Sequence, residues 1–302
     1  MTKAILKKQL MESFSWLYFN RKNGKKRTAK GIVGYVALYL MLFGMLGYMF
    51  YMMAITLAEP LCEAGIGWLF FVLMSLVAVV LGVFGSIFNT YASLYQPKDN
   101  DLLLSLPLPA SRILMARLAG VYLMGLMYEL IVMIPALLVW FQTGDVSAAG
   151  ILFSLLLPFI LSFFILSLSC ILGWVVALVS AHVKNKSAVT VALSLAFFAA
   201  YYYFYMKAYK MLFRVLDLAS DIAAGMKSYV YPLYQLGGAA QGSFFGFLFV
   251  TAVIAAVFAL VWLVLSRSFF RMATMQKGAA KVNTGNVPRE DKVRRERFLS
   301  GN

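Results

Sequence analysis

The sequence is poor in charged residues, and it has almost no histidine or cysteine. Asp, Glu, Lys and Arg make up 13% of its 302 residues, whereas a typical soluble domain contains about 25%. The chain is therefore too apolar to be a soluble globular protein. A single histidine, His182, with no Cys or carboxylate cluster beside it, argues against a metal site. We also expect no disulfide, because Cys62 lies near a predicted loop and Cys170 lies inside a predicted span.

Long apolar runs take the place of the missing charge. Hydrophobic residues account for 62% of the chain and aromatic residues for 16%. A helix of about 20 apolar residues is long enough to cross the hydrocarbon core of a bilayer. Because the runs are continuous rather than alternating, helices are favoured over a barrel. We predict an all-α integral membrane protein with six transmembrane helices, at 31–57, 66–94, 113–141, 150–179, 187–206 and 243–266.

The basic residues are concentrated on one side of this predicted six-span domain, which covers 31–266. Residues 1–30 and the tail 267–302 contain nine Lys or Arg each, and 95–117 contains three more. The first two loops on the opposite side carry three acidic residues and no basic residue. By the positive-inside rule, both termini and the 95–117 stretch face the cytoplasm. The net charge of +15 thus indicates orientation in the plasma membrane and attraction to its anionic lipids rather than nucleic-acid binding.

Two further segments are amphipathic but too polar to span the membrane. In 1–30, apolar residues at positions 5, 6, 10, 14 and 17 share one helical stripe, which is typical of a helix in the cytoplasmic interface. A basic leader with some hydrophobic residues is the alternative. In 207–226, polar residues at 207, 210, 214, 217 and 221 recur at helical spacing. We interpret 207–242 as an outer amphipathic segment, with a solvated loop helix as the alternative.

The cytoplasmic loop between predicted spans two and three, residues 95–112, is built like a short helix. It contains three residues that favour a helix start, three leucines on one face and a proline that ends the helix: Asp99, Asn100, Asp101, Leu102, Leu103, Leu106 and Pro107. A short leucine-faced helix on a cytoplasmic loop is a candidate ligand for a groove of a soluble partner. A loop tucked against the underside of the membrane is the other interpretation.

The run LYQPKDNDLLLSLPLPASRILMARL (94–118) is similar to a phrase found in bacterial ABC exporter permeases of the ABC-2 type. The predicted topology resembles that family over nearly the whole chain. The resemblance implies an N-terminal interfacial helix, six spans and a partly re-entrant outer element between spans five and six. It also implies that 99–107 is a coupling helix that docks on a separate ABC ATPase subunit.

The resemblance further implies which components another chain supplies. The phosphate-binding pattern G-x-x-x-x-G-K-[ST] does not occur in these 302 residues, so we expect the partner ATPase to bind ATP and Mg²⁺. We expect no cofactor in this chain and no enzymatic activity of its own. A second six-span permease unit would complete the transporter as a homodimer or heterodimer. Some family members fuse two such units, so a half-transporter and a piece of a longer permease both remain open.

Glu129 is the acidic residue that lies deep inside a predicted span. A charge at mid-membrane is expensive and usually faces a bundle interior or a cavity, so Glu129 is a candidate for the substrate path or for gating. The alternative is a structural role, in which Tyr128 or serines on neighbouring spans satisfy its carboxyl group. Pro135 in the same span is a second gating candidate, because a proline kinks a helix; packing is the simpler explanation.

Two other classes of protein compete with a transporter. An intramembrane enzyme needs paired polar groups within the bilayer, such as His with Ser, two Asp or Glu with His. One His near the cytoplasmic edge and one deep acid do not form such a pair. A structural or sensory membrane protein without transport activity is the stronger rival. An ABC ATPase encoded beside this chain would favour the transporter.

Overall fold

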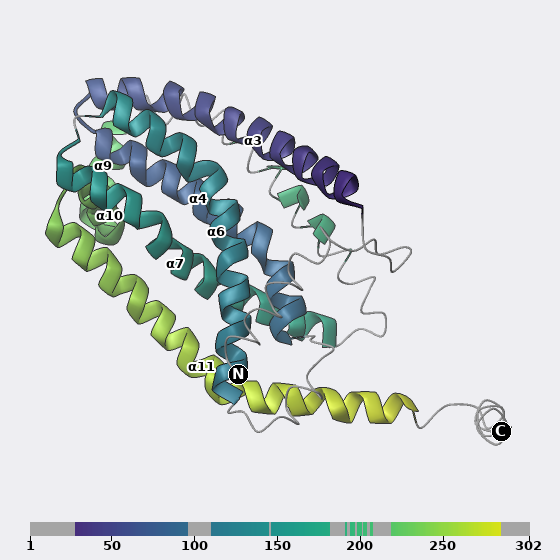
Figure 1. The fold of residues 1–302 in the computed structure, drawn as a ribbon. Helices are drawn as coiled ribbons and strands as arrows, with labels where there is room; N and C mark the ends of the chain where they lie inside the picture. The colour runs from purple at the N-terminus through teal and green to yellow at the C-terminus, as the bar shows by residue number, and fades with distance from the viewer. Residues whose placement is uncertain are drawn as a thin grey trace, which may run out of the picture.

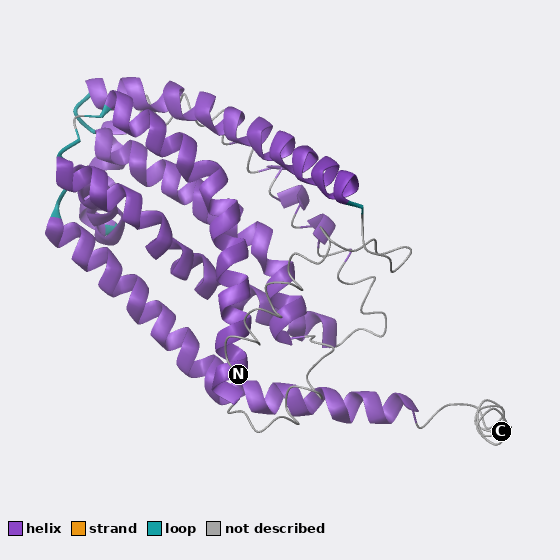
Figure 2. Ribbon diagram, viewed as in Figure 1, coloured by secondary structure: helices purple, strands orange, loops and turns teal. Residues whose placement is uncertain are grey.

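The computed structural model describes residues 28–95, 110–144, 146–181 and 219–284, together with 191, 194–196, 198–200, 202, 203, 206 and 207, with the backbone alone at 268–284. All regular structure in these ranges is helical (Figure 2). Five helices are long and apolar enough to cross a membrane, and they run side by side as a bundle (Figure 1). The chain is therefore a multi-pass membrane protein.

The first two described helices form an antiparallel hairpin. Helices α3 (Ala29–Glu63) and α4 (Gly67–Thr90) are joined by a tight turn in which Gly65 has a φ of +73°. The amide of Ile66 donates a hydrogen bond to the carbonyl oxygen of Leu61 at 2.9 Å. This closing bond and the left-handed residue before it define a Schellman motif, which explains the glycine at 65.

Helices α4, α6 and α7 form the centre of the bundle. Helix α4 continues into η1 (Tyr91–Tyr95), a single π-helical turn. The long helices α6 (Ala110–Thr143) and α7 (Ala148–Ala181) follow, and α4 packs most extensively on these two. The hydroxyl of Tyr122 in α6 donates a hydrogen bond to the carbonyl oxygen of Phe159 in α7 at 3.0 Å.

Two short helices precede the last long helix. Helices α9 (Ala219–Tyr229) and α10 (Tyr231–Gln241) lie at one end of the bundle, and α11 (Phe244–Thr284) runs back along it (Figure 1). A proline in the first turn of α10 is tolerated there, because that turn makes no use of its amide. The same end holds the α3–α4 and α6–α7 connections. We call it the α10 end.

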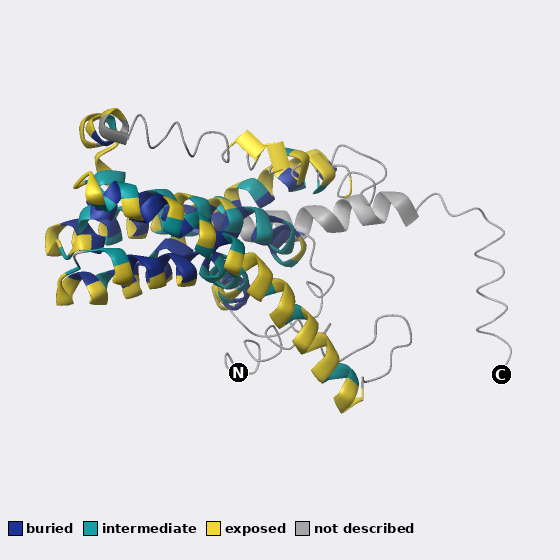
Figure 3. Cartoon of the chain, turned by 90° about the horizontal axis from the view of Figure 1, so that it is seen from above, coloured by how far each residue is buried: buried dark blue, intermediate teal, exposed yellow. Residues whose placement is uncertain are grey.

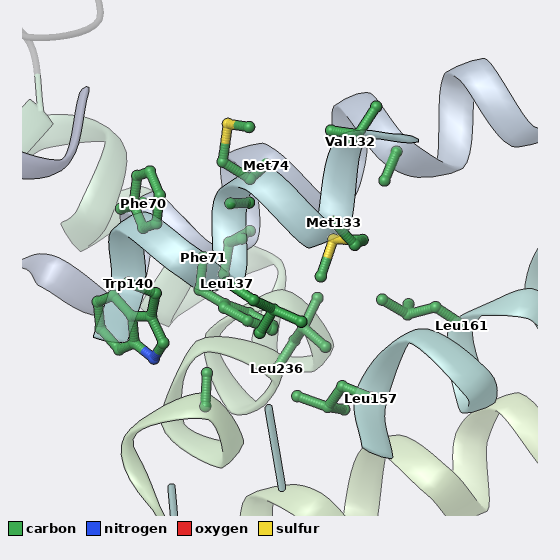
Figure 4. Close-up of a cluster of buried hydrophobic side chains, with 14 of the residues drawn as sticks. Phe70, Phe71, Met74, Val132, Met133, Leu137, Trp140, Leu157, Leu161 and Leu236 are labelled. Atoms are coloured by element: carbon green, nitrogen blue, oxygen red, sulfur yellow. The ribbon is translucent and has the colours of Figure 1, made fainter. Parts of the chain in front are cut away.

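The larger core lies toward the α10 end, where side chains from α4, α6, α7 and α10 meet (Figure 4). Trp140 stacks on Phe70 with the ring centroids 5.9 Å apart, and both rings are buried. Gly237 of α10 lies against Trp68, where a Cβ would come 2.8 Å from the Trp68 carbonyl oxygen. Helix α10 is thus built into the bundle, and its close approach requires a residue without a side chain.

The opposite end of the bundle, which we call the basic end, has a second core and carries positive charge. Lys30, Arg112 and Arg267 are exposed there. Arg117 lies nearby but is buried, with 2% of its surface exposed. The α10 end holds charges of both signs, with Glu59, Glu63, Asp221 and Lys227 among the described residues.

Five of the six predicted spans are confirmed as long apolar helices, at 31–57, 66–94, 113–141, 150–179 and 243–266. Within the sixth, 187–206, the structure describes separate residues alone, so this span stays a prediction. Ala181 ends α7 at the basic end, and Ala219 begins α9 at the α10 end.

Of the predicted outer segment at 207–242, the structure describes residue 207 and residues 219–242. The latter contain two helices separated at Val230, and the amphipathic character of the whole segment stays a prediction. The second helix, α10, was not predicted, and its residues Leu236 and Ala240 are buried among the long helices. The predicted interfacial helix at the N-terminus falls on 1–27 and lies outside the described residues.

The first half of α3 differs from the rest of the bundle. Figure 3 shows it leaning away from the other helices with mostly exposed residues. Met41 and Met45 are 75% and 72% exposed. Only from Phe50 onward does α3 contribute buried residues to the core.

Candidate functional site

The predicted docking residues 99–107 lie outside the described residues, but the structure describes the helices on both sides of them. Tyr95 ends η1, and Ala110 begins α6. Both lie at the basic end of the bundle. The segment 96–109 therefore joins α4 to α6, a pair of helices that pack closely along their length.

Glu129 lies in the middle of α6 and is completely buried, with 0% of its surface exposed. The hydroxyl of Ser162 in α7 donates a hydrogen bond to Oε2 of Glu129. The other carboxyl oxygen, Oε1, has no hydrogen-bond partner among the described residues. The structural alternative for Glu129 therefore has one supporting contact, from a serine on a neighbouring span. Half of the carboxyl group is left without such a contact in the described part of the chain.

Close packing of three helices seals this site. The side chain of Ile165 in α7 fits against Gly82 of α4 and Gly125 of α6. A Cβ at Gly82 would come 2.6 Å from Cδ1 of Ile165, and one at Gly125 would come 3.1 Å from Cγ2. Because Ile165 lies one turn after Ser162, this notch holds α7 close to α6 beside Glu129.

Tyr128, the other candidate partner of Glu129, points to a different helix. Its ring covers Gly85 of α4, where a Cβ would come 2.5 Å from Cδ2 of Tyr128. Adjacent residues on α6 thus serve two different interfaces, with Glu129 toward α7 and Tyr128 toward α4. Gly82 and Gly85 thus allow α7 and α6 to approach α4 closely.

Pro135 lies on the α3 side of α6 and does not converge with Glu129. Proline lacks an amide, so the carbonyl oxygen of Ile131, four residues earlier, has no helical donor. Gly47 of α3 lies here: a Cβ at that position would be 3.9 Å from Cγ of Pro135 and 4.0 Å from the Ile131 oxygen. The contact of α3 with Pro135 agrees with the packing interpretation, and a gating role for Pro135 stays a prediction.

Arg117 is a buried residue that the sequence placed at the membrane surface. It is buried on the face of α6 that carries Ile113, Leu114 and Val121, which belong to the second core. A buried guanidinium group requires polar partners to offset its loss of water. The sequence signal for its burial is the apolar spacing around it, since residues 113, 114, 117 and 121 share one helical face.

The chemistry of the buried polar groups favours helix packing over catalysis. The hydroxyls of Ser86 in α4 and Ser169 in α7 lie 2.6 Å apart, on the same face of α7 as Ser162. None of these serines is paired with an acid and a base together, and His182 lies outside the described residues. Among the residues that the structure describes, no three His, Cys, Asp or Glu side chains gather as metal ligands. The two cysteines are free thiols.

Comparison with known proteins identifies no relative: no protein family, no curated protein and no solved structure matches this chain.

Proposed function

We propose that this chain is the membrane-spanning subunit of an ATP-driven exporter of the ABC-2 permease type. The observation that carries the proposal is the position of Tyr95 and Ala110, the described residues that flank 96–109, at the basic end of the bundle. The similarity of 94–118 to exporter permeases points to the same segment as the dock for a separate ABC ATPase. That ATPase would bind ATP and Mg²⁺.

The close packing of α4 against α6 supports a mechanical role for this segment. The Tyr128 ring of α6 over Gly85 of α4 leaves little freedom for one of these two helices to move alone. A partner that pulled on 96–109 would therefore move a rigid group of helices. In this mechanism a second six-span unit provides the other wall of the substrate path, and Glu129 lies within the moving group.

The charge distribution supports the orientation that this function needs. Exposed Lys30, Arg112 and Arg267 share the end of the bundle from which 96–109 extends. If that end of the bundle faces the cytoplasm, the chain obeys the positive-inside rule for a protein of the plasma membrane. A cytoplasmic ATPase then has access to the docking segment.

The test is co-purification of this chain with the ABC ATPase encoded beside it. Leu103→Asp/Leu106→Asp puts two charges on the predicted docking face without touching a described helix. Ser105→Asp is the matched control, because it adds charge to the same segment off the leucine face. We expect the wild type and Ser105→Asp to retain the ATPase and the double variant to lose it.

The other outcomes separate the rival interpretations. If all three proteins retain the ATPase equally, 96–109 is not the principal dock and the docking assignment fails. If the wild type does not bind an ATPase, the exporter proposal fails and a structural or sensory membrane protein becomes the better interpretation.

A further inference from the structure

The way in which α4 ends links the proposed docking segment to a third helix. The last described turn before 96–109 is η1, a π-helical turn in which Tyr91, Leu94 and Tyr95 are buried. Single π-helical turns occur often at functional sites, because they redirect side chains that a regular helix would place elsewhere. Here the turn directs Tyr95 onto α7.

The contact between Tyr95 and α7 has both a polar and a steric part. The hydroxyl of Tyr95 donates a hydrogen bond to the carbonyl oxygen of Cys170 at 2.8 Å. The ring lies against Gly173, where a Cβ would come 3.2 Å from Cε2 of Tyr95. The ring fits this closely because residue 173 has no side chain. The residue from which the docking segment emerges is therefore fixed to α7 at two points.

The same face of α7 carries two other buried polar contacts between described helices. Ser169, next to Cys170 in the sequence, meets Ser86 of α4 at 2.6 Å. Ser162, two turns earlier, holds Glu129 of α6. Displacement of Tyr95 would thus be passed along α7 to the buried carboxyl group, through contacts that all lie within the described residues.

We propose that Tyr95 is a positioning residue that couples the docking segment to α7, so that ATPase movement displaces α7 as well as α4 and α6. The inference rests on the proposed exporter function. It adds a helix that is not adjacent to the docking segment in the sequence. It also assigns a specific role to the Tyr95 hydroxyl. A tyrosine that only filled space would not need this hydroxyl.

The experiment measures the movement of α7 in the complex of the full chain with its ATPase. Spin labels on Met41→Cys in α3 and Val175→Cys in α7, both exposed positions, report the α3–α7 distance by pulsed EPR. Cys62→Ala and Cys170→Ala remove the native thiols, and the second change leaves the accepting carbonyl in place. Distances are compared without nucleotide and with ATP trapped by vanadate.

Tyr95→Phe is the test variant, because it keeps the ring over Gly173 and removes only the hydroxyl. Tyr122→Phe is the matched control, since it removes the same group from a bond to another α7 carbonyl, that of Phe159. We expect trapping to shift the α3–α7 distance in the parent and in Tyr122→Phe, and the shift to be lost in Tyr95→Phe. Gly173→Ala, which pushes on the ring, should also reduce the shift.

Each remaining outcome counts against a specific statement. An unchanged shift in Tyr95→Phe overturns the coupling role of its hydroxyl. Equal loss of the shift in both Tyr variants shows a general packing effect and overturns it too. A parent that binds and hydrolyses ATP with its partner but shows no shift means that α7 does not move. If the parent binds no ATPase, the exporter proposal itself fails, and the inference fails with it.

Discussion

The Ser162 hydroxyl on α7 donates a hydrogen bond to Oε2 of Glu129 on α6, in a position from which solvent is fully excluded. The partner oxygen, Oε1, has no donor among the described residues. A buried polar atom without a partner costs stability, and natural proteins retain such atoms mostly where function requires them. The Glu129 carboxyl group therefore has two aspects. Its Oε2 atom accepts a structural hydrogen bond, and its Oε1 atom makes the group a functional candidate.

Replacement of Glu129 by leucine should separate these two roles. Because Leu has no polar atom to desolvate, we expect Glu129→Leu to raise the free energy of unfolding by about 1–2 kcal/mol. We expect the ATPase rate of the assembled complex to fall, because the carboxyl group is no longer present in the moving helices. Thermal unfolding in detergent and ATP hydrolysis by the complex measure the two effects.

Ser162→Ala is the control for the Glu129 prediction. It removes the bond but keeps the carboxyl group, so it should lower stability by about 1–3 kcal/mol and change the ATPase rate less than Glu129→Leu does. A less stable Glu129→Leu protein with an unchanged ATPase rate would show that Glu129 has a structural role alone.

The glycines of α4 and α3 should respond very differently to alanine. A Cβ at Gly85 would come 2.5 Å from the Tyr128 ring, whereas Gly44 has nothing within 4 Å of its Cβ position. We expect Gly85→Ala to destabilise the protein by about 1–3 kcal/mol through overpacking. Gly44→Ala should be neutral or slightly stabilising, because alanine is the better helix former. Equal melting temperatures for the two variants would contradict the packing of α4 against α6.

The Ser86–Ser169 contact can be measured by a double-mutant cycle. The two hydroxyls lie 2.6 Å apart within the buried α4–α7 interface. We expect the single alanine variants and the double variant to give a coupling energy of about 0.6 kcal/mol, the average for interhelical hydrogen bonds in membranes. Additive effects of the two substitutions would show that the contact contributes no stability.

Labelling of introduced cysteines should report the orientation of the bundle. In a chain carrying Cys62→Ala and Cys170→Ala, we expect Tyr229→Cys to react with a membrane-impermeant maleimide on intact cells. Arg112→Cys should react only after permeabilisation. Both positions are exposed, at opposite ends of the bundle. Reaction of Arg112→Cys from outside would invert the proposed orientation, and reaction of both from outside would contradict the proposed number of crossings.

The sequence predicted those parts of the fold that follow from hydrophobicity alone. Five spans were located because runs of about 20 apolar residues have one stable solution in lipid. By contrast, α10 was missed because its short, glycine-rich stretch has no strong periodicity. Its helix depends on packing against Trp68 and on the left-handed end at Gly242.

The site was predictable to a similar degree. A single acid in an apolar span identifies Glu129 without any structure. Which serine holds it depends on the relative rotation of α6 and α7, and that is set by the fit of Ile165 between two glycines. The burial of Arg117 and the contact of Tyr95 with Cys170 likewise depend on tertiary packing. The apolar face around Arg117 is a local signal for its burial, but no local pattern encodes the contact of Tyr95.

Assembly of the bundle has to begin without help from the first half of α3. The most apolar 18-residue window of this helix has 0% of its residues buried by the rest of the protein. Helices of membrane proteins can insert independently and associate afterwards, so α3 enters the bilayer on its own hydrophobicity. Association then starts at its second half, where Phe50, Ala54 and Leu57 meet α4 and α6. During biosynthesis the chain therefore acquires a membrane anchor before it acquires a core.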